Sequence, residues 1–294
     1  MKIIEPSVEL WQQDVDWEAH VARCARICYR SDKTTNNDRL IKRLMNDKHF
    51  SMFRHRSVYW IVPIGQLGNN YIDYAAVHDI ISNKIFCRYK LFNNKYYIAT
   101  NGHYYLNNVD YLQHLDKYIV DELTFKNTEI GHSIARYTFK VVTQISTSRE
   151  LNRVSPNNIS EQSTRYVYED GTLCKPWWID KVSEDSKTVT TTIYKGSESE
   201  IYTSECILCS YLNSCKDSFN NYKYLVDKGM NRQDARGVLP LDTATVCAYT
   251  YFIDEWKHIL DLRYHGVTGK PHPNAKIVAS MIRDYLLQEG YDFV

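Results

Sequence analysis

The sequence predicts an α+β fold, in which an antiparallel or mixed sheet packs against long helices. Strand-like alternation of apolar and polar residues occurs at residues 57–63 and 137–144. Apolar residues recur at helical intervals at residues 16–29, 36–47, 199–227 and 274–288. Because both periods are present in one chain, we expect strands and long helices in the same protein.

The elements of the first half follow from local signals. Asp16 is a suitable N-cap for the first helix, and the second helix is expected to bury one face, formed by Leu40, Ile41, Leu44 and Met45. The next expected elements are a strand at 80–90, a hairpin turn at Asn93 and Asn94, a return strand at 95–99 and a helix at 112–123.

In the second half, residues 180–196 are polar and predict a mobile surface loop. The long helix at 199–227 is expected to end at Gly229, since glycine closes helices readily. Pro240 is suited to the first turn of a further helix, which the pattern extends over residues 241–263.

Composition limits the classes of function. A chain of 294 residues can form one large domain or two small ones, and its net charge of +1 argues against a nonspecific nucleic-acid binder. No apolar run resembles a signal peptide or membrane span, so we expect a cytoplasmic protein without membrane contact. Cys206, Cys209 and Cys215 lack a second ligand pair at zinc-finger spacing, which favours buried reduced thiols on helix faces and no metal.

Residues 144–166 combine many hydrogen-bond donors with little apolar filler. The window follows the strand at 137–144, and its polar residues include three arginines, three asparagines, two glutamates and several short hydroxyl side chains, among them Arg149, Arg153, Arg165, Ser148, Ser155, Ser160, Ser163, Thr164, Asn152, Asn157, Asn158, Glu150 and Glu161. A polar loop of this kind can bind a phosphate, since guanidinium groups pair with its oxygens. A solvated loop with incidental arginines is an equally open interpretation.

The segment 150–166 resembles the signature of the flavin-dependent thymidylate synthases, the ThyX family. That signature is Arg-His-Arg, seven residues and Ser, usually followed by a small residue and Arg-Tyr. Arg153, Ser163 and Arg165 match without a gap, whereas Val154 and Ser155 replace the His and second Arg of the triplet.

Further blocks resemble the same family in the same order. Residues 25–31 form the first block, which ends in Ser31, and residues 49–55 form the second, which matches at His49, Ser51 and His55 but has Arg54 in place of Glu. Residues 235–240, Ala-Arg-Gly-Val-Leu-Pro, contain Arg236, and residues 254–263 end in Arg263. The last block is 271–274, Pro-His-Pro-Asn. The resemblance implies one ThyX-like domain over residues 1–294, with family-variable insertions at about 64–136 and 169–198.

The resemblance also implies an activity: methylation of dUMP at C5 to dTMP, with methylenetetrahydrofolate as carbon donor, reduced FAD as hydride donor and NADPH as reductant. It further implies a homotetramer whose active sites are shared between subunits. The implied catalytic residues are Arg263 and Ser163. The implied substrate-binding residues are Glu150, Arg153, Glu161, Ser163, Arg165, Arg236 and Arg263. The implied cofactor-binding residues are Ser31, His49, Ser51, Arg54, Arg153, Ser160, Glu161, His258 and His272.

The chemistry of these residues agrees with that activity. A nucleotide monophosphate is a dianion, which Arg153, Arg165 and Arg236 can bind by charge-assisted hydrogen bonds. A cation at the O2/N3 edge of uracil would stabilise the negative charge that develops in the reaction, and Arg263 is the candidate. The mechanism needs no protein nucleophile, so Ser163 is expected to act as a ligand.

Two alternatives remain open: a ThyX relative that makes another C5-modified pyrimidine nucleotide, for example a hydroxymethyl product, and a nucleotide-binding homologue that has lost catalysis. Both are motivated by the altered triplet. Restoring His at 154 and Arg at 155 would tighten FAD binding if contacts have only been lost. It would weaken binding if Arg54 or Arg149 already supplies a cation there, and this second outcome is the one we expect.

Overall fold

The computed structural model describes residues 1–13, 16–30, 36–67, 71–154, 156–184, 188–194 and 200–292, with the side chains of 183–206 excepted. The described chain is α+β, with helices and predominantly antiparallel sheets, as predicted. It divides into two compact units. The smaller unit comprises Met1–Pro6, Val142–Arg149 and Ser163–Thr245, and the larger unit comprises Ser7–Val141, Glu150–Gln162 and Val246–Val294. A single domain over residues 1–294 stays a prediction.

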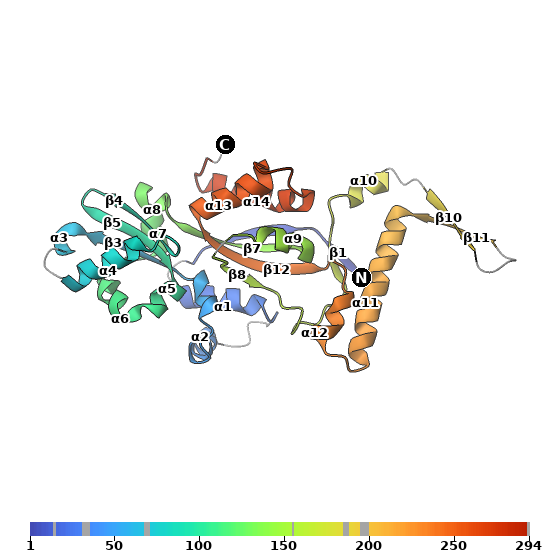
Figure 1. Ribbon diagram of the computed structural model, residues 1–294, viewed down its shortest axis with the longest axis horizontal. Helices are drawn as coiled ribbons and strands as arrows, with labels where there is room; N and C mark the ends of the chain where they lie inside the picture. Colours follow the sequence, from blue (N-terminus) through green and yellow to red (C-terminus); the bar gives the residue numbers. More distant parts are fainter. Residues whose placement is uncertain are drawn as a thin grey trace. The chain divides into compact units, whose positions relative to one another are not determined.

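The elements follow one another as labelled in Figure 1. The strands are β1 (Lys2–Ile4), β2 (Ser7–Trp11), β3 (Ser57–Pro63), β4 (Cys87–Phe92), β5 (Lys95–Asn101), β6 (Ile119–Val120), β7 (Arg136–Gln144), β8 (Ile159–Glu161), β9 (Thr172–Cys174), β10 (Thr188–Tyr194), β11 (Glu200–Cys206) and β12 (Ala244–Phe252). The α-helices are α1 (Trp17–Ile27), α2 (Asn37–Asn46), α3 (Ile64–Leu67), α4 (Tyr71–Ser82), α5 (Gly102–Asn107), α6 (Val109–Leu112), α7 (Glu122–Lys126), α8 (Glu129–His132), α9 (Ile145–Leu151), α10 (Ile179–Glu184), α11 (Ile207–Asp227), α12 (Arg232–Ala235), α13 (Ile253–Leu260) and α14 (Pro273–Gln288). Short 3-10 segments are η1 (Phe50–His55), η2 (Gln113–Tyr118) and η3 (Arg236–Val238), and η4 (Asp261–His265) is a π-helix.

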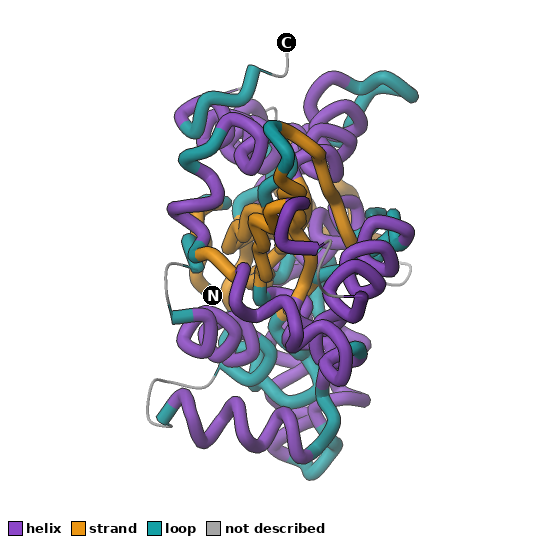
Figure 2. Tube along the Cα trace, turned by 90° about the vertical axis from the view of Figure 1, so that its left-hand side faces the viewer, coloured by secondary structure: helices purple, strands orange, loops and turns teal. Residues whose placement is uncertain are grey.

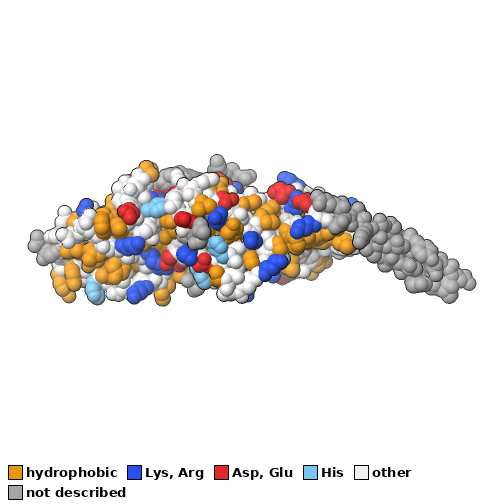
Figure 3. Space-filling view, turned by 90° about the horizontal axis from the view of Figure 1, so that it is seen from above, with side chains coloured by type: hydrophobic (Ala, Val, Ile, Leu, Met, Phe, Trp, Pro, Cys, Tyr) orange, Lys and Arg blue, Asp and Glu red, His pale blue; other side chains and the backbone are white. Residues whose placement is uncertain are grey.

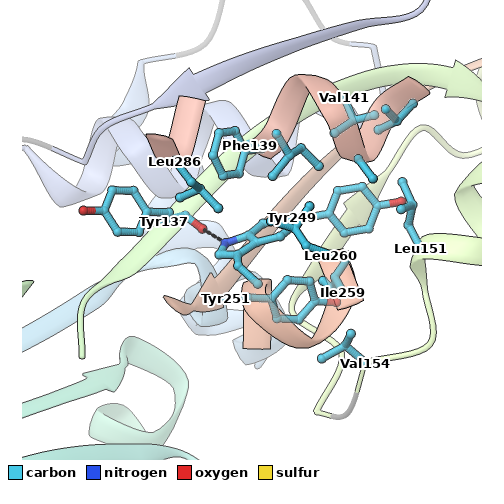
Figure 4. Close-up of a cluster of buried hydrophobic side chains, with 14 of the residues drawn as sticks. Tyr137, Phe139, Val141, Leu151, Val154, Tyr249, Tyr251, Ile259, Leu260 and Leu286 are labelled. Carbon is cyan, nitrogen blue, oxygen red and sulfur yellow. Dashed lines mark hydrogen bonds between the residues drawn. The ribbon is translucent and has the colours of Figure 1, made fainter. Parts of the chain in front are cut away.

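A four-stranded sheet of order β2-β7-β12-β8 supports the larger unit. One face of β7 and β12 is apolar and packs against α13 and α14, with Tyr137, Phe139, Tyr249 and Tyr251 at the centre of the cluster (Figure 4). The indole N–H of Trp256 donates to the carbonyl of Tyr137 over 3.0 Å, which satisfies its buried donor. The core therefore lies between this sheet and the C-terminal helices.

The opposite face of the same strands is polar and lies against α1 (Figure 1). Because side chains alternate along a strand, Thr138 and Thr250 point away from the apolar cluster, with their hydroxyls 2.7 Å apart. His20 Nε2 lies 3.1 Å from the Thr138 hydroxyl, and His55 Nδ1 lies 2.8 Å from the Thr250 hydroxyl. Arg136 is fully buried beside them and donates to backbone carbonyls, including that of Arg54 over 2.7 Å.

This buried layer predicts a loss of stability in acid. Burial, with the charges of Arg136 and Arg54, lowers the pKa of His55 to about 3, and burial together with Arg23 lowers the pKa of His20 well below its usual value. An unfolded histidine titrates near pH 6.5, so below about pH 6.5 the unfolded chain binds protons that the folded chain excludes. As the pH decreases below this value, we expect the free energy of unfolding to fall by up to about 1.4 kcal/mol per pH unit for each of these histidines.

Urea unfolding at several pH values between about 7.5 and 5 measures this dependence. The variant His55→Asn should show a shallower slope than the wild type over the same range. An equal slope in the two proteins would contradict the assignment to His55.

A second sheet of the larger unit, of order β4-β5-β3-β6, carries α3 and α4 (Figure 1). Figure 2 shows the molecule from this end, with strands in orange and helices in purple. Its β4–β5 hairpin turns at Asn93 and Asn94, whose φ angles of 46° and 55° are those of a type I′ turn. The expected turn and return strand are therefore confirmed. On the face of the larger unit that carries α13 and α14, acidic and basic side chains are interspersed (Figure 3).

The smaller unit is built on the parallel pair β1–β9, in which Ile3 lies opposite Leu173. The long helix α11 packs on this pair through Cys215 and Phe219, which form a buried cluster with Leu173. Gly229 ends the helical segment with a φ angle of 92°, as predicted. The strands β10 and β11 pair as an antiparallel hairpin.

The helices predicted at 16–29, 36–47 and 274–288 and the strands at 57–63 and 137–144 are confirmed as α1, α2, α14, β3 and β7. The Asp16 carboxylate accepts from the amide of Ala19 over 2.8 Å, which confirms the cap. Met45, however, is 40% exposed and lies outside the buried face of α2, and Cys209 is exposed rather than buried.

Several predicted elements are wrong in type or extent. The strand at 80–90 is the end of α4 followed by β4, and the helix at 112–123 is divided among α6, η2, β6 and α7. Much of the loop at 180–196 is α10 and β10, and β11 occupies the start of the helix expected at 199–227. The helix at 241–263, with Pro240 in its first turn, is instead β12 followed by α13 and η4, because residues 247–249 pair with β8.

Within the described residues, each helix is too short or too polar to cross a membrane.

Candidate active site

The smaller unit brings two separated motifs together as an arginine cluster, formed by Arg165, Arg232 and Arg236. Arg236 Nη1 donates to Thr164 Oγ1 over 3.1 Å, although the two residues belong to different motifs. The amide of Arg165 lies 3.3 Å from Ser163 Oγ, and its Nη2 lies 3.5 Å from Gln233 Oε1. The predicted substrate residues Ser163, Arg165 and Arg236 are therefore neighbours.

Arg232 is a member of this cluster that the sequence analysis missed. Its Nη1 donates to the carbonyl of Tyr166 over 2.6 Å, and its guanidinium lies 5.8 Å from the centre of the Tyr168 ring. The signal was present in the sequence, since Arg232 precedes Arg236 by one helical turn and residues at that spacing share a face.

The cluster keeps most of its donors available. All three guanidinium groups are exposed, and each commits one N–H to a hydrogen bond with the described part of the chain. A guanidinium has five N–H donors, so the remaining donors, with the hydroxyls of Ser163 and Thr164, suit a polyanionic oxygen ligand such as a phosphate.

In the larger unit, Arg263 lies against Glu150. Arg263 is in the π-helix η4, a rare turn that is frequent at functional sites. Its Nε donates to the Glu150 carbonyl over 2.8 Å, and its Nη2 is 3.5 Å from Glu150 Oε2. Two predicted substrate residues from distant segments are thus joined directly.

Glu161 belongs to a hydrogen-bonded chain that begins in the core. The hydroxyl of Tyr249 donates to Asn152 Oδ1 over 2.9 Å, and Asn152 Nδ2 donates to Glu161 Oε2 over 3.4 Å. Burial raises the pKa of Tyr249 well above its usual value, so the hydroxyl keeps its proton. Asn152 and Tyr249 therefore orient the Glu161 carboxylate, a role that no sequence pattern indicated.

A groove of about 1510 Å³ in the larger unit lies among α1, α2 and η1. The predicted cofactor residues His49 and Ser51 line it. Four cationic side chains line it as well, Arg26, Arg39, Lys42 and Arg43, together with the acidic side chains of Asp38 and Asp47. Met52 also lines the groove, and the buried Ser160 next to it donates a hydrogen bond to Met52 Sδ over 3.2 Å.

The remaining predicted cofactor residues are dispersed. His258 is exposed on α13, and His272 caps α14, with its Nδ1 accepting from the amide of Asn274 over 3.3 Å. His55, part of the same sequence block as His49, is fully buried under the sheet. Ser31 lies outside the described residues.

Arg54 reaches the signature segment from η1. Its Nη1 donates to the carbonyl of Asn157 over 2.8 Å, and its Nε donates to His103 Nδ1 over 3.2 Å. Burial and the Arg54 charge lower the pKa of His103, so this imidazole is neutral and accepts at Nδ1. Arg149 is exposed and lies in the smaller unit.

Comparison with known proteins identifies the family of this chain. The family described as thymidylate synthase complementing protein (Thy1) matches residues 128–284, more than half of the chain. The chain belongs to this family, which is the ThyX family. It is therefore a nucleotide-modifying enzyme of the ThyX type. No curated protein matches the chain.

Two similar solved structures are of the UMP/dUMP methylase PolB from Streptomyces cacaoi. The structure bound with 5-Br dUMP has a TM-score of 0.46 and 16% identity, and the match covers 98% of this chain and 93% of that one. The structure bound with 5-Br UMP has a TM-score of 0.44 and 17% identity, with 98% and 92% covered.

This ThyX member diverges at the signature triplet, and the structure shows what the divergence does. Arg153 is exposed, and its side chain has no hydrogen-bond or ion-pair partner among the described residues. Val154 is 7% exposed and belongs to the apolar cluster of β7, β12 and α13 (Figure 4). Ser155 lies outside the described residues. Position 154 is therefore a core position in this protein.

Proposed function

We propose that this protein is a flavin-dependent thymidylate synthase. It would methylate dUMP at C5 to give dTMP, with methylenetetrahydrofolate as carbon donor, FAD as hydride carrier and NADPH as its reductant. The observation that carries the proposal is the arginine cluster, in which Arg165 and Arg236 meet the hydroxyls of Ser163 and Thr164. This donor set suits the dianionic phosphate of a nucleotide.

The nucleotide residues have separate tasks in this proposal. Arg165 and Arg236 bind the phosphate, Ser163 adds a neutral donor, and Arg153 supplies a further cation. Arg263 stabilises the charge that develops on the pyrimidine, because a fixed guanidinium needs no reorganisation during the reaction. The carboxylates of Glu150 and Glu161 accept hydrogen bonds from the nucleotide, and both are held in place by the contacts described above.

The groove residues fit FAD. The four cationic side chains that line the groove suit the pyrophosphate of FAD. His49 and Ser51 add hydrogen-bond donors for the polar edge of the flavin ring. The further candidates for contact with FAD are Arg54, Ser160 and Glu161, together with Ser31, Arg153, His258 and His272 from the family blocks. When bound, reduced FAD supplies the hydride, which no protein side chain can provide. Val154 adds no donor, because it is buried among apolar side chains.

The decisive experiment is spectroscopic. We expect the purified protein to be yellow, alone or after FAD is added, to bleach when NADPH is added without oxygen, and to regain its colour with methylenetetrahydrofolate and dUMP. Mass spectrometry of the nucleotide should show dTMP. A hydroxymethyl nucleotide would instead favour another C5 modification, and a colourless protein that binds dUMP would favour a homologue without catalysis. Light scattering should show a tetramer.

Loss of Arg165 or of Arg236 from the arginine cluster is expected to weaken dUMP binding. A charge-assisted hydrogen bond contributes about 1.5–3 kcal/mol, so Arg165→Ala and Arg236→Ala should each raise the Kd by about tenfold or more. Calorimetric titration measures the change. Lys228→Ala removes an exposed cation elsewhere in the smaller unit and is the matched control.

Deoxyuridine separates the phosphate from the base in this test. Since it has no phosphate, its weak binding should be equal in the wild type and both arginine variants. Unchanged dUMP affinity in both variants would overturn the assignment of the cluster to the phosphate.

A further inference from the structure

Arg54 is held by its main chain and by two nitrogens of its guanidinium. Its carbonyl accepts from the fully buried Arg136 over 2.7 Å, which anchors the main chain of η1. Its Nη1 donates to the carbonyl of Asn157 over 2.8 Å, and its Nε donates to His103 Nδ1 over 3.2 Å. Because a guanidinium is planar and rigid, these two bonds fix its orientation. Its Nη2 has no hydrogen-bond or ion-pair partner among the residues that the structure describes.

His103 reaches Arg54 because α5 lies close against η1. Gly102 is the first residue of α5, and its amide donates to the carbonyl of Arg56 over 2.8 Å. A Cβ at position 102 would lie 2.8 Å from Arg56 Cβ and 2.9 Å from the carbonyl oxygen of Phe53, which is closer than real Cβ atoms approach. Glycine therefore permits the contact between the two helices that brings His103 to the guanidinium.

The imidazole of His103 is an acceptor and not a second cation. Burial, followed by the charge of Arg54, lowers the pKa of His103, so the ring is neutral. A neutral imidazole has one N–H and one acceptor nitrogen. Since Nδ1 accepts from Arg54, the N–H is on Nε2, which lies 3.2 Å from the side-chain amide of Asn107, one turn further along α5. The ring thus orients Arg54 without adding charge.

The side chain of Arg54 leaves η1 on the side of the groove. Residues i and i+3 of a 3-10 helix are eclipsed, so Arg54 projects on the same side as Ser51, which lines the groove. In the proposed function, Ser51 and His49 contact the polar edge of the flavin ring, whereas the cations of α1 and α2 contact the pyrophosphate. Reduced flavin carries its negative charge on this polar edge, over N1 and O2, and a cation there changes its redox behaviour.

We propose that His103 is a positioning residue, which holds Arg54 so that the unpaired edge of its guanidinium stabilises the negative charge of reduced FAD. The inference rests on the proposed function, because it takes FAD to lie in the groove. It adds a residue outside every motif of the sequence, and it assigns Arg54 to the reduced flavin ring instead of the pyrophosphate. The expected consequence is a raised reduction potential of the bound FAD.

The reduction potential separates the ring from the pyrophosphate. The pyrophosphate has the same charge in both redox states, so a cation beside it binds both states equally. The variant His103→Phe keeps a flat ring and removes the acceptor. It should weaken the binding of reduced FAD about tenfold relative to oxidised FAD, which lowers the two-electron potential by about 30 mV. Equilibration with a reference dye measures the potential, and titration of FAD into the apoprotein measures the affinity of the oxidised form.

A conservative variant and a double-mutant cycle distinguish positioning from a general structural role. In His103→Asn the amide oxygen can accept from Arg54, so the potential should stay close to that of the wild type. Arg54→Met should lower the potential at least as far as His103→Phe does. Adding His103→Phe to Arg54→Met should then change nothing more, since the two residues act through one contact. His114→Phe replaces an exposed imidazole elsewhere in the larger unit and is the matched control.

Each outcome decides for or against the inference. If the wild type binds FAD but His103→Phe leaves the potential unchanged, or His103→Asn lowers it equally, His103 does not position Arg54 and the inference is overturned. Equal weakening of both redox states in Arg54→Met would place Arg54 at the pyrophosphate and overturn it as well. A wild type that binds no FAD would instead remove the proposed function, and this inference with it. Thermal melting checks the fold, and His103→Ala, which also lacks the acceptor, replaces His103→Phe if that variant does not fold.

Discussion

Replacing Arg263 by alanine is expected to reduce turnover by about 100- to 1,000-fold, the usual consequence of removing one fixed donor from a developing negative charge. The guanidinium is held in place before the reaction by its bond to the Glu150 carbonyl. It is 13% exposed, so water can only partly replace it. Its loss should therefore act mainly on kcat.

The measurement is the rate of dTMP formation, with FAD absorbance and thermal melting as checks on the fold. Arg263→Lys is the matched control. Lysine keeps the charge but cannot bond the Glu150 carbonyl and present a second donor in one plane, so we expect an intermediate rate. Turnover close to that of the wild type in Arg263→Ala would remove Arg263 from the mechanism.

Replacing Val154 by histidine is expected to destabilise the protein by about 3 kcal/mol, since an imidazole would be larger than valine and would enter the core without a partner. Val154 is 7% exposed in the cluster that contains Leu151, Tyr251 and Ile259 (Figure 4). The sequence alone suggested that histidine at this position would face the flavin. The structure shows a packed apolar surrounding, so a family histidine has no space here.

Urea unfolding measures the effect, with Val154→Ile as the control that adds volume without polarity. We expect Val154→Ile to lose less stability than Val154→His. FAD titrated into Val154→His should bind no more tightly than to the wild type. A stable Val154→His protein with tighter FAD binding would show that position 154 faces the flavin after all.

Arg54 bears on the same divergence. Its contact with Asn157 places a cation beside the signature segment, as the sequence-based hypothesis required of Arg54 or Arg149. Adding an arginine at position 155 should then meet a like charge, and the expected weakening of FAD binding by the double restoration stays a prediction. The neutral imidazole of His103, bonded to Arg54, was not indicated by any motif.

Local signals determined those parts of the fold that local chemistry controls. The cap at Asp16, the turn at Asn93 and Asn94 and the end of a helix at Gly229 were predicted because each depends on a few neighbouring residues. The segment 244–252 was predicted as helix and is a strand. Most residues of β12 are buried on both faces, and the segment contains no charged side chain, so its period cannot distinguish it from a buried helix, and pairing with β8 decided the outcome.

The sequence by itself also singled out Ser163, Arg165 and Arg236 as substrate-binding residues, and the structure places them as neighbours. Their role in substrate binding stays a prediction. Tertiary structure alone decided whether a side chain is buried or exposed and which residues it contacts. It placed Val154 in the core, brought Arg54 to Asn157 and joined Arg263 to Glu150. The physical reason is that burial and long-range hydrogen bonds depend on segments far apart in the chain, which spacing and composition do not specify.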